Sequence, residues 1–279
     1  MLRIAVPNKG SLAETAAEML HEAGYSGRRD PRALSVRDER NDVEFFYLRP
    51  RDIATYVGSG ALDVGITGRD LLLDSGSAAI EIEALDFAGS TFRFAGEPGR
   101  FDKLSDLGGV RVATSYPGLV RGFLAKNGVA AELVGLDGAV ESAVRLGVAD
   151  AVADVVSTGS TLRAQGLEIF GPVILESTAV LISRTVDVPG VSTLQRRLQG
   201  VRVARQFVLV DYDVPVKLLD AATRVTPGLE SPTVSPLHDP EWVAVRAMVP
   251  RQDTNHVMDE LYELGARAIL VSSIHAARI

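Results

Sequence analysis

One segment of the sequence, from Asp154 to Leu162, combines groups that could bind a phosphorylated sugar. An apolar run predicted to form a strand ends at Asp154, and Gly159 would let the backbone amides of the following turn approach an anion closely. The turn also carries four hydroxyl groups, those of Ser157, Thr158, Ser160 and Thr161. A helix predicted to begin near Leu162 would direct its N-terminal amides at the same anion.

Two interpretations of this turn stay open on its residues alone. The Asp154 carboxylate would repel a phosphate, so its natural partners would be sugar hydroxyls or Mg²⁺, and a phosphate beside a hydroxylated sugar would suit the whole segment. A turn capped by Ser and Thr between a strand and a helix is also common in α/β proteins without any ligand. The residues of the turn are therefore equally consistent with a sugar-phosphate site and with a structural cap.

Basic residues follow three other predicted strands. They are Lys9 after the first strand, Arg49 and Arg51 where a second strand meets a helix, and Arg69 beside Asp70 at a third junction. Alone, Lys9 is an ordinary solvated loop lysine, whereas three basic junctions at the carboxyl edge of one sheet form a cluster. Such a cluster could bind a polyphosphate although the whole chain has a net charge of −7.

Other candidate groups give weaker indications. The segment Thr114–Gly118 is a further strand end with hydroxyl groups, including that of Tyr116, and an ordinary turn explains it at least as well. The four histidines show no metal-ligand spacing. The sequence contains no Walker A motif, no G-x-G-x-x-G and no G-x-S-x-G, which disfavours P-loop, dinucleotide and serine-hydrolase sites.

Alternating strands and helices must position these groups. In the first part of the chain, periodicity predicts strands at Leu2–Val6, Val43–Leu48 and Val64–Thr67 and helices at Ser11–Ala23, Pro50–Val57 and Gly68–Leu73. This order indicates a largely parallel sheet. The polar segment Arg28–Asn41 is predicted to be a solvated loop or hairpin.

A second α/β series follows a change of composition near residues 86–95, where we expect the chain to cross between domains. Its predicted elements are strands at Val110–Thr114, Glu132–Val134 and Ala151–Asp154 and helices at Leu119–Lys126 and Ala139–Leu146. A G-x-x-D echo, Gly60–Asp63 and Gly147–Asp150, precedes a strand in both series; two similar lobes or chance would explain it. Two lobes would bind a ligand between them, at the carboxyl ends of both sheets.

The last part of the chain predicts a different unit. A strand at Thr178–Ser183 could return to the first lobe, and Val191–Arg205 is predicted to be a helix. Strands then follow at Phe207–Asp211, Thr233–Leu237, Trp242–Val249 and Ala268–Val271, with helices at Val216–Arg224 and Asp253–Leu264. The order βαββαβ is that of the ferredoxin-like fold, which by itself assigns no function.

Length and composition limit the class of protein. The 279 residues, 46% of them hydrophobic, suffice for two or three domains. The net charge of −7 disfavours nucleic acid and anionic membranes as partners, and the absence of cysteine excludes disulfide, thiolate and cysteine–zinc chemistry. The first residues predict a strand rather than a signal peptide, and no apolar run reaches the roughly 20 residues of a membrane helix. We therefore expect a soluble, cytoplasmic protein.

Several motifs in order resemble the long form of the ATP phosphoribosyltransferase family across nearly the whole chain. They are residues 3–10, 51–53, 63–68, 113–117 and 150–163, followed by 226–237, 258–261 and 265–270. The resemblance implies an α/β fold of two lobes like those of type II periplasmic binding proteins, followed by the ferredoxin-like βαββαβ regulatory domain. The implied boundaries are residues 1–90 with 178–205 for lobe I, 91–177 for lobe II with the phosphoribosyl loop, and 206–279 for a histidine-sensing domain.

The same resemblance implies an activity and its partners. Enzymes of this family begin histidine biosynthesis by transferring the phosphoribosyl group of 5-phosphoribosyl 1-pyrophosphate to N1 of ATP, with Mg²⁺ present and pyrophosphate released. L-Histidine would inhibit the enzyme by feedback, and copies of the chain would form a hexamer built from dimers, with no separate regulatory subunit. The substrate phosphates would hold most of the Mg²⁺ coordination.

The resemblance also assigns residues. It gives catalytic roles to Asp154, Lys9 and Arg49, and substrate binding to Ser157, Thr158, Gly159, Ser160, Thr161, Arg51, Asp70, Glu141 and Tyr116. It gives histidine binding to Asp213, Leu229, Ser231, Thr233, Met248 and Ala268. The sequence departs from the family at Ser11, where many relatives carry arginine, so one triphosphate contact lacks its usual residue.

Two other functions would use some of these features without catalysis. A two-lobed sensor of an anionic solute would explain the lobes and the basic junctions but not the match of the last domain. An amino-acid-sensing regulator would explain the last domain alone. Turnover with both substrates distinguishes the enzyme from either.

Overall fold

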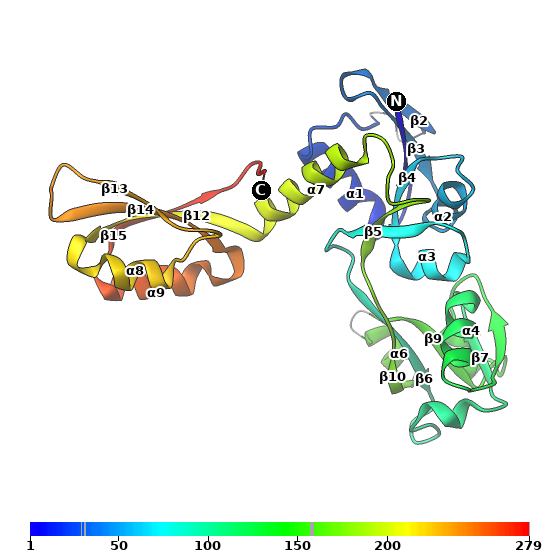
Figure 1. The fold of residues 1–279 in the computed structure, drawn as a ribbon. Coiled ribbons are helices and arrows are strands. Elements are labelled where there is room, and N and C mark those ends of the chain that lie inside the picture. Colours follow the sequence, from blue (N-terminus) through cyan, green and yellow to red (C-terminus); the bar gives the residue numbers. More distant parts are fainter. Residues whose placement is uncertain (29, 31, 157–158, 279) are drawn as a thin grey trace. The chain divides into compact units, whose positions relative to one another are not determined.

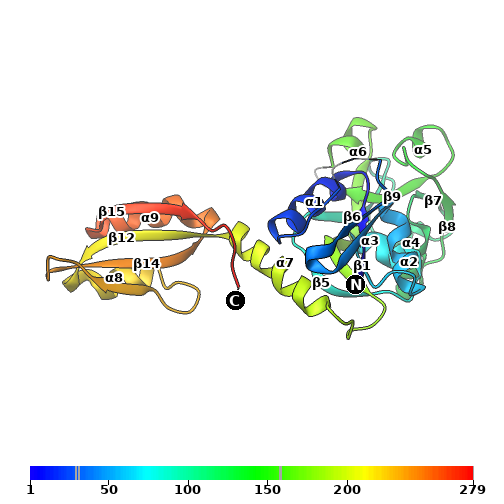
Figure 2. The same ribbon diagram turned by 90° about the horizontal axis from the view of Figure 1, so that it is seen from above.

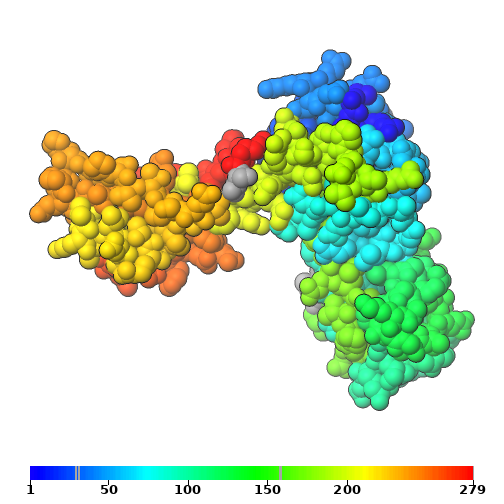
Figure 3. Space-filling model, viewed as in Figure 1, coloured from blue at the N-terminus to red at the C-terminus, as the bar shows by residue number. Residues whose placement is uncertain are grey.

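The computed structural model of the chain describes residues 1–28, 30, 32–156 and 159–278. It divides into two compact units, Met1–His21 with Tyr25–Ser192, and Glu22–Gly24 with Thr193–Ile279, each with its own hydrophobic core. The first unit itself has two lobes, coloured blue to cyan and green in Figure 3. In the part of the chain that the structure describes, no helix has the length and hydrophobicity needed to cross a lipid bilayer.

The first lobe is a six-stranded sheet in the order β2-β3-β1-β4-β11-β5 (Figure 1). Its elements are β1 (Leu2–Pro7), α1 (Ser11–Glu22), β2 (Ser35–Asp38), β3 (Val43–Leu48), α2 (Pro50–Gly58), β4 (Val64–Gly68), α3 (Arg69–Ser75), β5 (Ile80–Ala84) and β11 (Ala179–Ser183). β1 lies parallel between β3 and β4, so the carboxyl ends of these three strands meet at one edge of the sheet. The helices α1, α2 and α3 each begin from that edge.

The second lobe is a five-stranded sheet in the order β10-β6-β9-β7-β8. Its elements are β6 (Ser90–Gly96), β7 (Arg111–Thr114), α4 (Pro117–Lys126), β8 (Glu132–Gly135), α5 (Ser142–Arg145), β9 (Ala151–Val156), α6 (Ser160–Ala164) and β10 (Glu168–Ser177). Two linking segments join the lobes, residues 85–89 and Thr178, and Thr178 Oγ1 donates to the carbonyl of Phe87 at 2.9 Å. The N–H of Ala179, the first residue of β11, donates to the same carbonyl at 2.9 Å.

The two lobes repeat one anchoring pattern. In the first lobe Arg3 of β1 pairs with Asp63, with Nη2 2.8 Å from Oδ1, and in the second lobe Arg111 of β7 pairs with Asp150, with Nε 3.0 Å from Oδ2. Each arginine also donates its backbone N–H to the aspartate carboxylate and accepts the aspartate's backbone N–H at its own carbonyl. These aspartates end the two G-x-x-D segments of the sequence, so the echo marks equivalent places in two similar sheets.

Several elements differ from the sequence-based expectation. The periodicity missed β5, β6 and β10, and β6 begins within the stretch that we expected to be a crossing. The helix predicted at Ala139–Leu146 is reduced to the four residues of α5, because Gly138 and Ala139 both have positive φ. β9 continues beyond Asp154 to Val156, since β6 pairs with it along that length, so Asp154 lies within the strand and not at its end. The polar segment before β3 contains β2, which forms a hairpin with β3.

The second unit is a helix followed by a four-stranded antiparallel sheet in the order β13-β14-β12-β15. Its elements are α7 (Val191–Gln206, which begins in the first unit), β12 (Phe207–Pro215), α8 (Leu219–Val225), β13 (Thr233–Pro236), β14 (Trp242–Pro250), α9 (Thr254–Leu264) and β15 (Arg267–Ser273). The predicted βαββαβ order is confirmed. α8 and α9 cover one face of the sheet (Figures 1 and 2), where Val208, Val210, Tyr212 and Val214 of β12 are buried against them. Short 3₁₀ helices occur along the chain at Glu39–Asn41, Leu104–Leu107, Val216–Leu218 and Arg251–Asp253.

Candidate active site between the two lobes

A cavity of 690 Å³ lies between the two lobes of the first unit. Its lining includes Arg51 and Asp70 of the first lobe, Tyr116, Asp154 and Ser177 of the second, and Thr178 of a linking segment. The volume falls within the range of about 300–1,000 Å³ that is usual for small-molecule sites. A guanidinium, two carboxylates and several hydroxyls in one cavity suit a phosphorylated and hydroxylated ligand.

Asp70 is fixed at the cavity by the end of β10. It is the second residue of α3, which follows directly on β4. The hydroxyl of Ser177 donates to Asp70 Oδ1 at 3.0 Å and accepts the backbone N–H of Asp70 at 3.1 Å. The carboxylate also lies over Gly68, where the Cβ of any other residue would collide with it. The position of this buried carboxylate is therefore set before any ligand arrives.

Asp154 reaches the cavity from within β9 and is half-buried there. Burial raises the pKa of its carboxyl group, and the nearby carboxylates of Glu141 and Asp70 raise it further. The N–H of Val155, which donates to Oδ1 at 2.8 Å, and the charge of Arg51 act in the opposite direction. A carboxyl group whose pKa is perturbed by burial and by named charges in a cavity is a functional candidate.

The ring of Tyr116 lies between a cation and another aromatic ring. The guanidinium carbon of Arg51 is 4.8 Å from the centre of the Tyr116 ring, and Phe92 packs edge-to-face against it at 5.1 Å. Burial, and then the neighbouring Asp70 carboxylate, raise the pKa of the Tyr116 hydroxyl well above its ordinary value. The phenol therefore keeps its proton at neutral pH and can donate a hydrogen bond.

The structure brings together four of the residues predicted from the sequence, Arg51, Asp70, Tyr116 and Asp154. Three others do not line this cavity. Lys9 and Arg49 are exposed on the segments that follow β1 and β3, and Glu141 immediately precedes α5, close enough to Asp154 to raise its pKa. The roles of these three stay predictions.

The hydroxyl-rich turn is described in part. Ser157 and Thr158 lie outside the described residues. Gly159 is buried with φ of +69°, a left-handed conformation that favours glycine, and α6 begins directly after it. Ser160 and Thr161 are exposed in the first turn of α6. Ligand binding by this turn stays a prediction.

Some site features were missed or wrongly placed by the sequence patterns. Ser177 is 107 residues away from its partner Asp70, and no local pattern indicates that they meet. Arg69, which we expected to join the basic cluster, instead forms a bidentate ion pair with Glu81, with Nε and Nη2 at 2.8 and 2.7 Å from the carboxylate oxygens. It also donates to the carbonyl of Glu176, so its charge is used in bonds within the first unit.

Two carboxylates at the cavity could contact a divalent cation. In the part of the chain that the structure covers, no group of three or more His, Cys, Asp or Glu side chains is placed to hold a metal ion. Mg²⁺ is commonly bound through one or two carboxylates together with substrate phosphates and water. Asp70 and Asp154 therefore fit a Mg²⁺ ion that arrives with a phosphorylated ligand, and they do not form a complete protein site.

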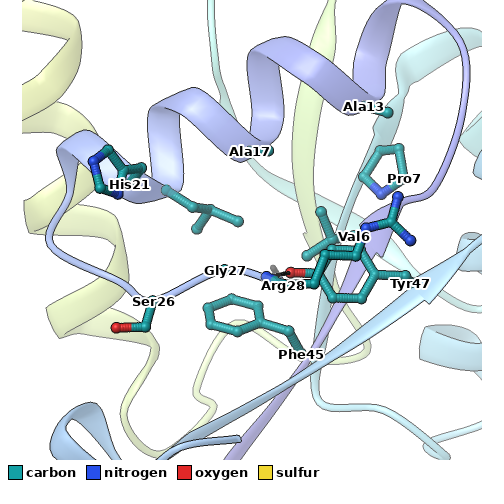
Figure 4. Close-up of a pocket in the computed structure, with 11 residues that line it drawn as sticks. Val6, Pro7, Ala13, Ala17, His21, Ser26, Gly27, Arg28, Phe45 and Tyr47 are labelled. Carbon is teal, nitrogen blue, oxygen red and sulfur yellow. Dashed lines mark hydrogen bonds between the residues drawn. The ribbon is translucent and has the colours of Figure 1, made fainter. Parts of the chain in front are cut away.

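A second cavity, of 460 Å³, lies between α1 and the first sheet (Figure 4). Ala13 and Ala17 of α1 face Phe45 and Tyr47 across it, and their small side chains leave the space open. The backbone N–H of Arg28 donates to the Tyr47 hydroxyl at 2.9 Å, and the Arg28 guanidinium lies 4.3 Å from the centre of that ring. None of the described residues lining this cavity is Asp or Glu, so it lacks the carboxylates that suit sugar hydroxyls.

The residues expected to bind histidine all lie in the second unit. In the register of the sheet, Asp213, Thr233 and Met248 belong to the face opposite α8 and α9. Leu229 and Ser231 lie in the connection between α8 and β13, and Ala268 has φ of +51° where the β12–β15 pairing shifts register. Their binding role stays a prediction.

Comparison with known proteins gives matches over both units. A family model described as "ATP phosphoribosyltransferase" matches residues 49–200, and one described as "HisG, C-terminal domain" matches residues 204–276. The ATP phosphoribosyltransferase of Arthrobacter sp. (strain FB24) is 64% identical over 286 residues, and that of Streptomyces coelicolor 60% over 285, each match covering all of both chains.

A solved structure supports the same assignment. The chain resembles the ATP phosphoribosyl transferase (HisG:HisZ) complex of Thermotoga maritima, with 28% identity and a TM-score of 0.63, over 72% of this chain and 98% of that one. Together with the three sheets described above, these matches confirm the predicted fold class of two α/β lobes and a ferredoxin-like domain.

Proposed function

The chain belongs to the ATP phosphoribosyltransferase family, and we propose that its interlobe cavity transfers the phosphoribosyl group of 5-phosphoribosyl 1-pyrophosphate to N1 of ATP. The products are 1-(5-phospho-β-D-ribosyl)-ATP and pyrophosphate, and the reaction is the first step of L-histidine biosynthesis. One observation supports the proposed location of the reaction: the lining of the cavity includes Arg51, Asp70, Tyr116 and Asp154, all of them within the segment that matches the family. No observation favours a sensor without catalysis.

The reaction requires charge stabilisation and positioning more than a strong base. N1 of ATP attacks C1 of the ribose with its lone pair while the bond from C1 to the pyrophosphate oxygen breaks, so the ribose gains oxocarbenium character and the pyrophosphate gains negative charge. Arg51 stabilises the negative charge on the pyrophosphate, and Asp154 accepts hydrogen bonds from the ribose hydroxyls. The Tyr116 hydroxyl donates a hydrogen bond to the substrate from the second lobe. Mg²⁺ bound with the phosphates, within reach of Asp70 or Asp154, would supply further positive charge.

Other residues complete this proposal. The ribose 5-phosphate is bound by the turn residues Ser157, Thr158, Gly159, Ser160 and Thr161. Lys9 and Arg49 contact the polyphosphate of the nucleotide, and Glu141 contributes to substrate binding. The left-handed Gly159 supports the first role, because a glycine in that conformation leaves neighbouring backbone N–H groups open to an anion. The exposure of Lys9 and Arg49 supports the second, because a cation that meets an incoming polyphosphate must be accessible.

The second unit is proposed to sense L-histidine, in a cytoplasmic homohexamer built from dimers. Its sheet face opposite the helices carries Asp213, whose carboxylate could pair with the α-amino group or the imidazolium of histidine. Thr233 and Met248 share that face, while Leu229, Ser231 and Ala268 lie in nearby segments of the unit. The match of residues 204–276 to a family C-terminal domain supports regulation within the chain, without a separate regulatory subunit.

The test is turnover by the full chain with ATP, 5-phosphoribosyl 1-pyrophosphate and Mg²⁺, followed by pyrophosphate release and by product absorbance, with and without L-histidine. Turnover that histidine suppresses supports the roles of both units. Turnover that histidine leaves unchanged retains the reaction and refutes the histidine role. Folded protein that gives no turnover overturns the proposed reaction.

A further inference from the structure

The amino end of α4 has no cap from its own segment. Tyr116, the residue before the helix, makes no capping hydrogen bond with its side chain, and Pro117 occupies the first turn. The N–H groups of Gly118 and Leu119 instead donate to Oδ1 of Asp74, at 2.8 and 3.1 Å. Asp74 belongs to α3, so a carboxylate of the first lobe caps a helix of the second.

The same carboxylate also holds a cation of the cavity. Oδ2 of Asp74 accepts a hydrogen bond from Nη1 of Arg51 at 3.0 Å, and the Asp74 side chain is only 10% exposed. Arg51 in turn lies over the ring of Tyr116. We call this set, Asp74 with Arg51 and the N–H groups of Gly118 and Leu119, the Asp74 bridge. It joins α2, α3 and α4 at a single side chain.

The bridge depends on a close approach of two helices. At Gly118 a Cβ would collide with the backbone carbonyl oxygen of Asp74 and lie 3.2 Å from its Oδ1. The φ of Gly118 is not positive, so the close approach and not the backbone conformation requires glycine. Gly122, one turn further along α4, faces open space instead. The amino end of α4 therefore docks directly on the last turn of α3.

We propose that Asp74 is a positioning residue for phosphoribosyl transfer, because its bridge makes the orientation of Arg51 depend on the docking of α4 against α3. This proposal rests on the function proposed above. Asp74 engages one nitrogen of the planar guanidinium, which fixes the directions of the remaining N–H donors toward a phosphate. When the lobes separate, the two N–H bonds to Asp74 break, and the carboxylate that orients Arg51 loses its own anchor. Arg51 is then fully oriented only with the lobes closed.

The substitution Asp74→Asn separates capping from orientation. The amide oxygen can still accept the N–H groups of Gly118 and Leu119, but an NH₂ group replaces the acceptor that Arg51 uses. We expect kcat/KM for 5-phosphoribosyl 1-pyrophosphate, and the affinity for inorganic pyrophosphate measured by calorimetry, to fall about tenfold with little change in melting temperature. In an Arg51→Ala background the same substitution should lower kcat/KM and pyrophosphate affinity by less than about twofold, because its effect acts through Arg51.

Two glycine variants test the docking without altering any charge. Gly118→Ala should reduce kcat/KM in the same direction as Asp74→Asn, because the added methyl group forces α4 away from α3. Gly122→Ala is the matched control on the same helix and should leave kcat/KM unchanged. Asp63→Asn is the control for Asp74→Asn. It removes a carboxylate that is ion-paired with Arg3, at the end of β4 away from the cavity, and it should also leave kcat/KM unchanged.

The outcomes separate this proposal from the proposed reaction. If the wild-type chain gives no turnover, the reaction fails, and the bridge is judged by pyrophosphate affinity alone. Equal losses from Asp74→Asn with and without Arg51 would show that Asp74 does not act through Arg51 and would overturn the proposal. Wild-type kinetics and affinity in Asp74→Asn, or no pyrophosphate binding by the wild-type chain, would also overturn it.

Discussion

The negative charge of Asp154 is expected to help substrate binding and to lower the stability of the folded chain. Burial raises the pKa of its carboxyl group, so at neutral pH the folded chain holds a charge that its surroundings disfavour. Unfolding exposes that charge to water and removes the penalty. Hydrogen bonds from ribose hydroxyls would offset the penalty in the occupied site, which is the reason we expect an acidic residue at this position.

Replacing Asp154 with Asn should therefore raise stability while it removes activity. The cost of burying a charged carboxylate is present above the raised folded-state pKa and vanishes at low pH, where the group is protonated. The neutral amide of asparagine has no such cost at any pH. We expect a gain of about 1 kcal/mol in the free energy of unfolding at pH 7.5 and a loss of at least about 100-fold in kcat/KM. Thermal melts and steady-state assays check the two effects, and a lower melting temperature would contradict the first.

The pH dependence of turnover should respond to Glu141. The negative charge of Glu141 helps to hold the pKa of Asp154 up, so Glu141→Gln should lower that pKa and keep Asp154 ionised to lower pH. The acid limb of the kcat/KM profile should then shift toward lower pH. Glu168→Gln, at an exposed carboxyl on β10, is the control and should leave the limb in place. A limb that does not move in Glu141→Gln would show that Asp154 does not control it.

At the scale of residues, the sequence predicted the groups that follow strands. Asp70 and Tyr116 come just after apolar runs, and parallel strands bring such ends to one edge. Partners that meet only through the tertiary structure could not be predicted: Ser177 lies 107 residues from Asp70, and Asp74 lies 44 residues from Gly118. Arg69 was misplaced for the same reason, because its partner Glu81 follows on β5, a strand that periodicity missed.

Among the elements, the anchoring pairs make a prediction about acid stability. Hydrogen bonds from Arg111, and a further one from Arg100, lower the pKa of the Asp150 carboxyl to about 2. A depressed folded-state pKa adds stability above the unfolded value of about 3.9, and this is lost as pH falls toward 2. We expect Asp150→Asn to be about 1 kcal/mol less stable than the wild-type chain at pH 7, since the pair is partly exposed.

Urea denaturation at several pH values tests this prediction. The difference between wild type and Asp150→Asn should be constant above about pH 5 and should shrink between about pH 4 and pH 2. Asn127→Ala, which removes an exposed side chain whose amide donates to the backbone carbonyl of Phe123, serves as a reference for a change without a titrating carboxyl. A difference that is the same at pH 7 and at pH 2.5 would mean that the ion pairs of Asp150 with Arg111 and Arg100 are not its source.

The strands with an uninterrupted apolar pattern could be predicted, and those with interruptions could not. β1, β4 and β11 are almost wholly buried runs in the first sheet, and β3 alternates buried with half-buried residues. β10 has a register shift between Phe170 and Leu175, so its pattern changes phase within the strand. The short α5 shows the opposite error, since apolar spacing predicted a helix where positive φ angles shorten it.

For the molecule as a whole, the second unit should control inhibition without controlling the reaction. We expect Asp213→Ala to raise the histidine concentration needed for half inhibition at least about tenfold, because a charge-assisted hydrogen bond is lost. Turnover without histidine should stay within about twofold of the wild-type value. Asp220→Ala, in the first turn of α8 on the covered side of the sheet, is the matched control and should retain normal inhibition. Unaltered inhibition of Asp213→Ala would remove that residue from the effector site.

The repeated anchors suggest how a two-substrate site can change during evolution. In each lobe a strand is tied by an Arg–Asp pair at one end, Arg3–Asp63 or Arg111–Asp150. A cavity carboxylate lies further along the chain, Asp70 just beyond β4 in the first lobe and Asp154 within β9 in the second. The two halves therefore share a framework, while the residues beyond each anchored strand differ. Selection can therefore act on the cavity residues of one lobe and leave the framework and the cavity residues of the other lobe intact. A cavity of this design can acquire new specificity one side at a time.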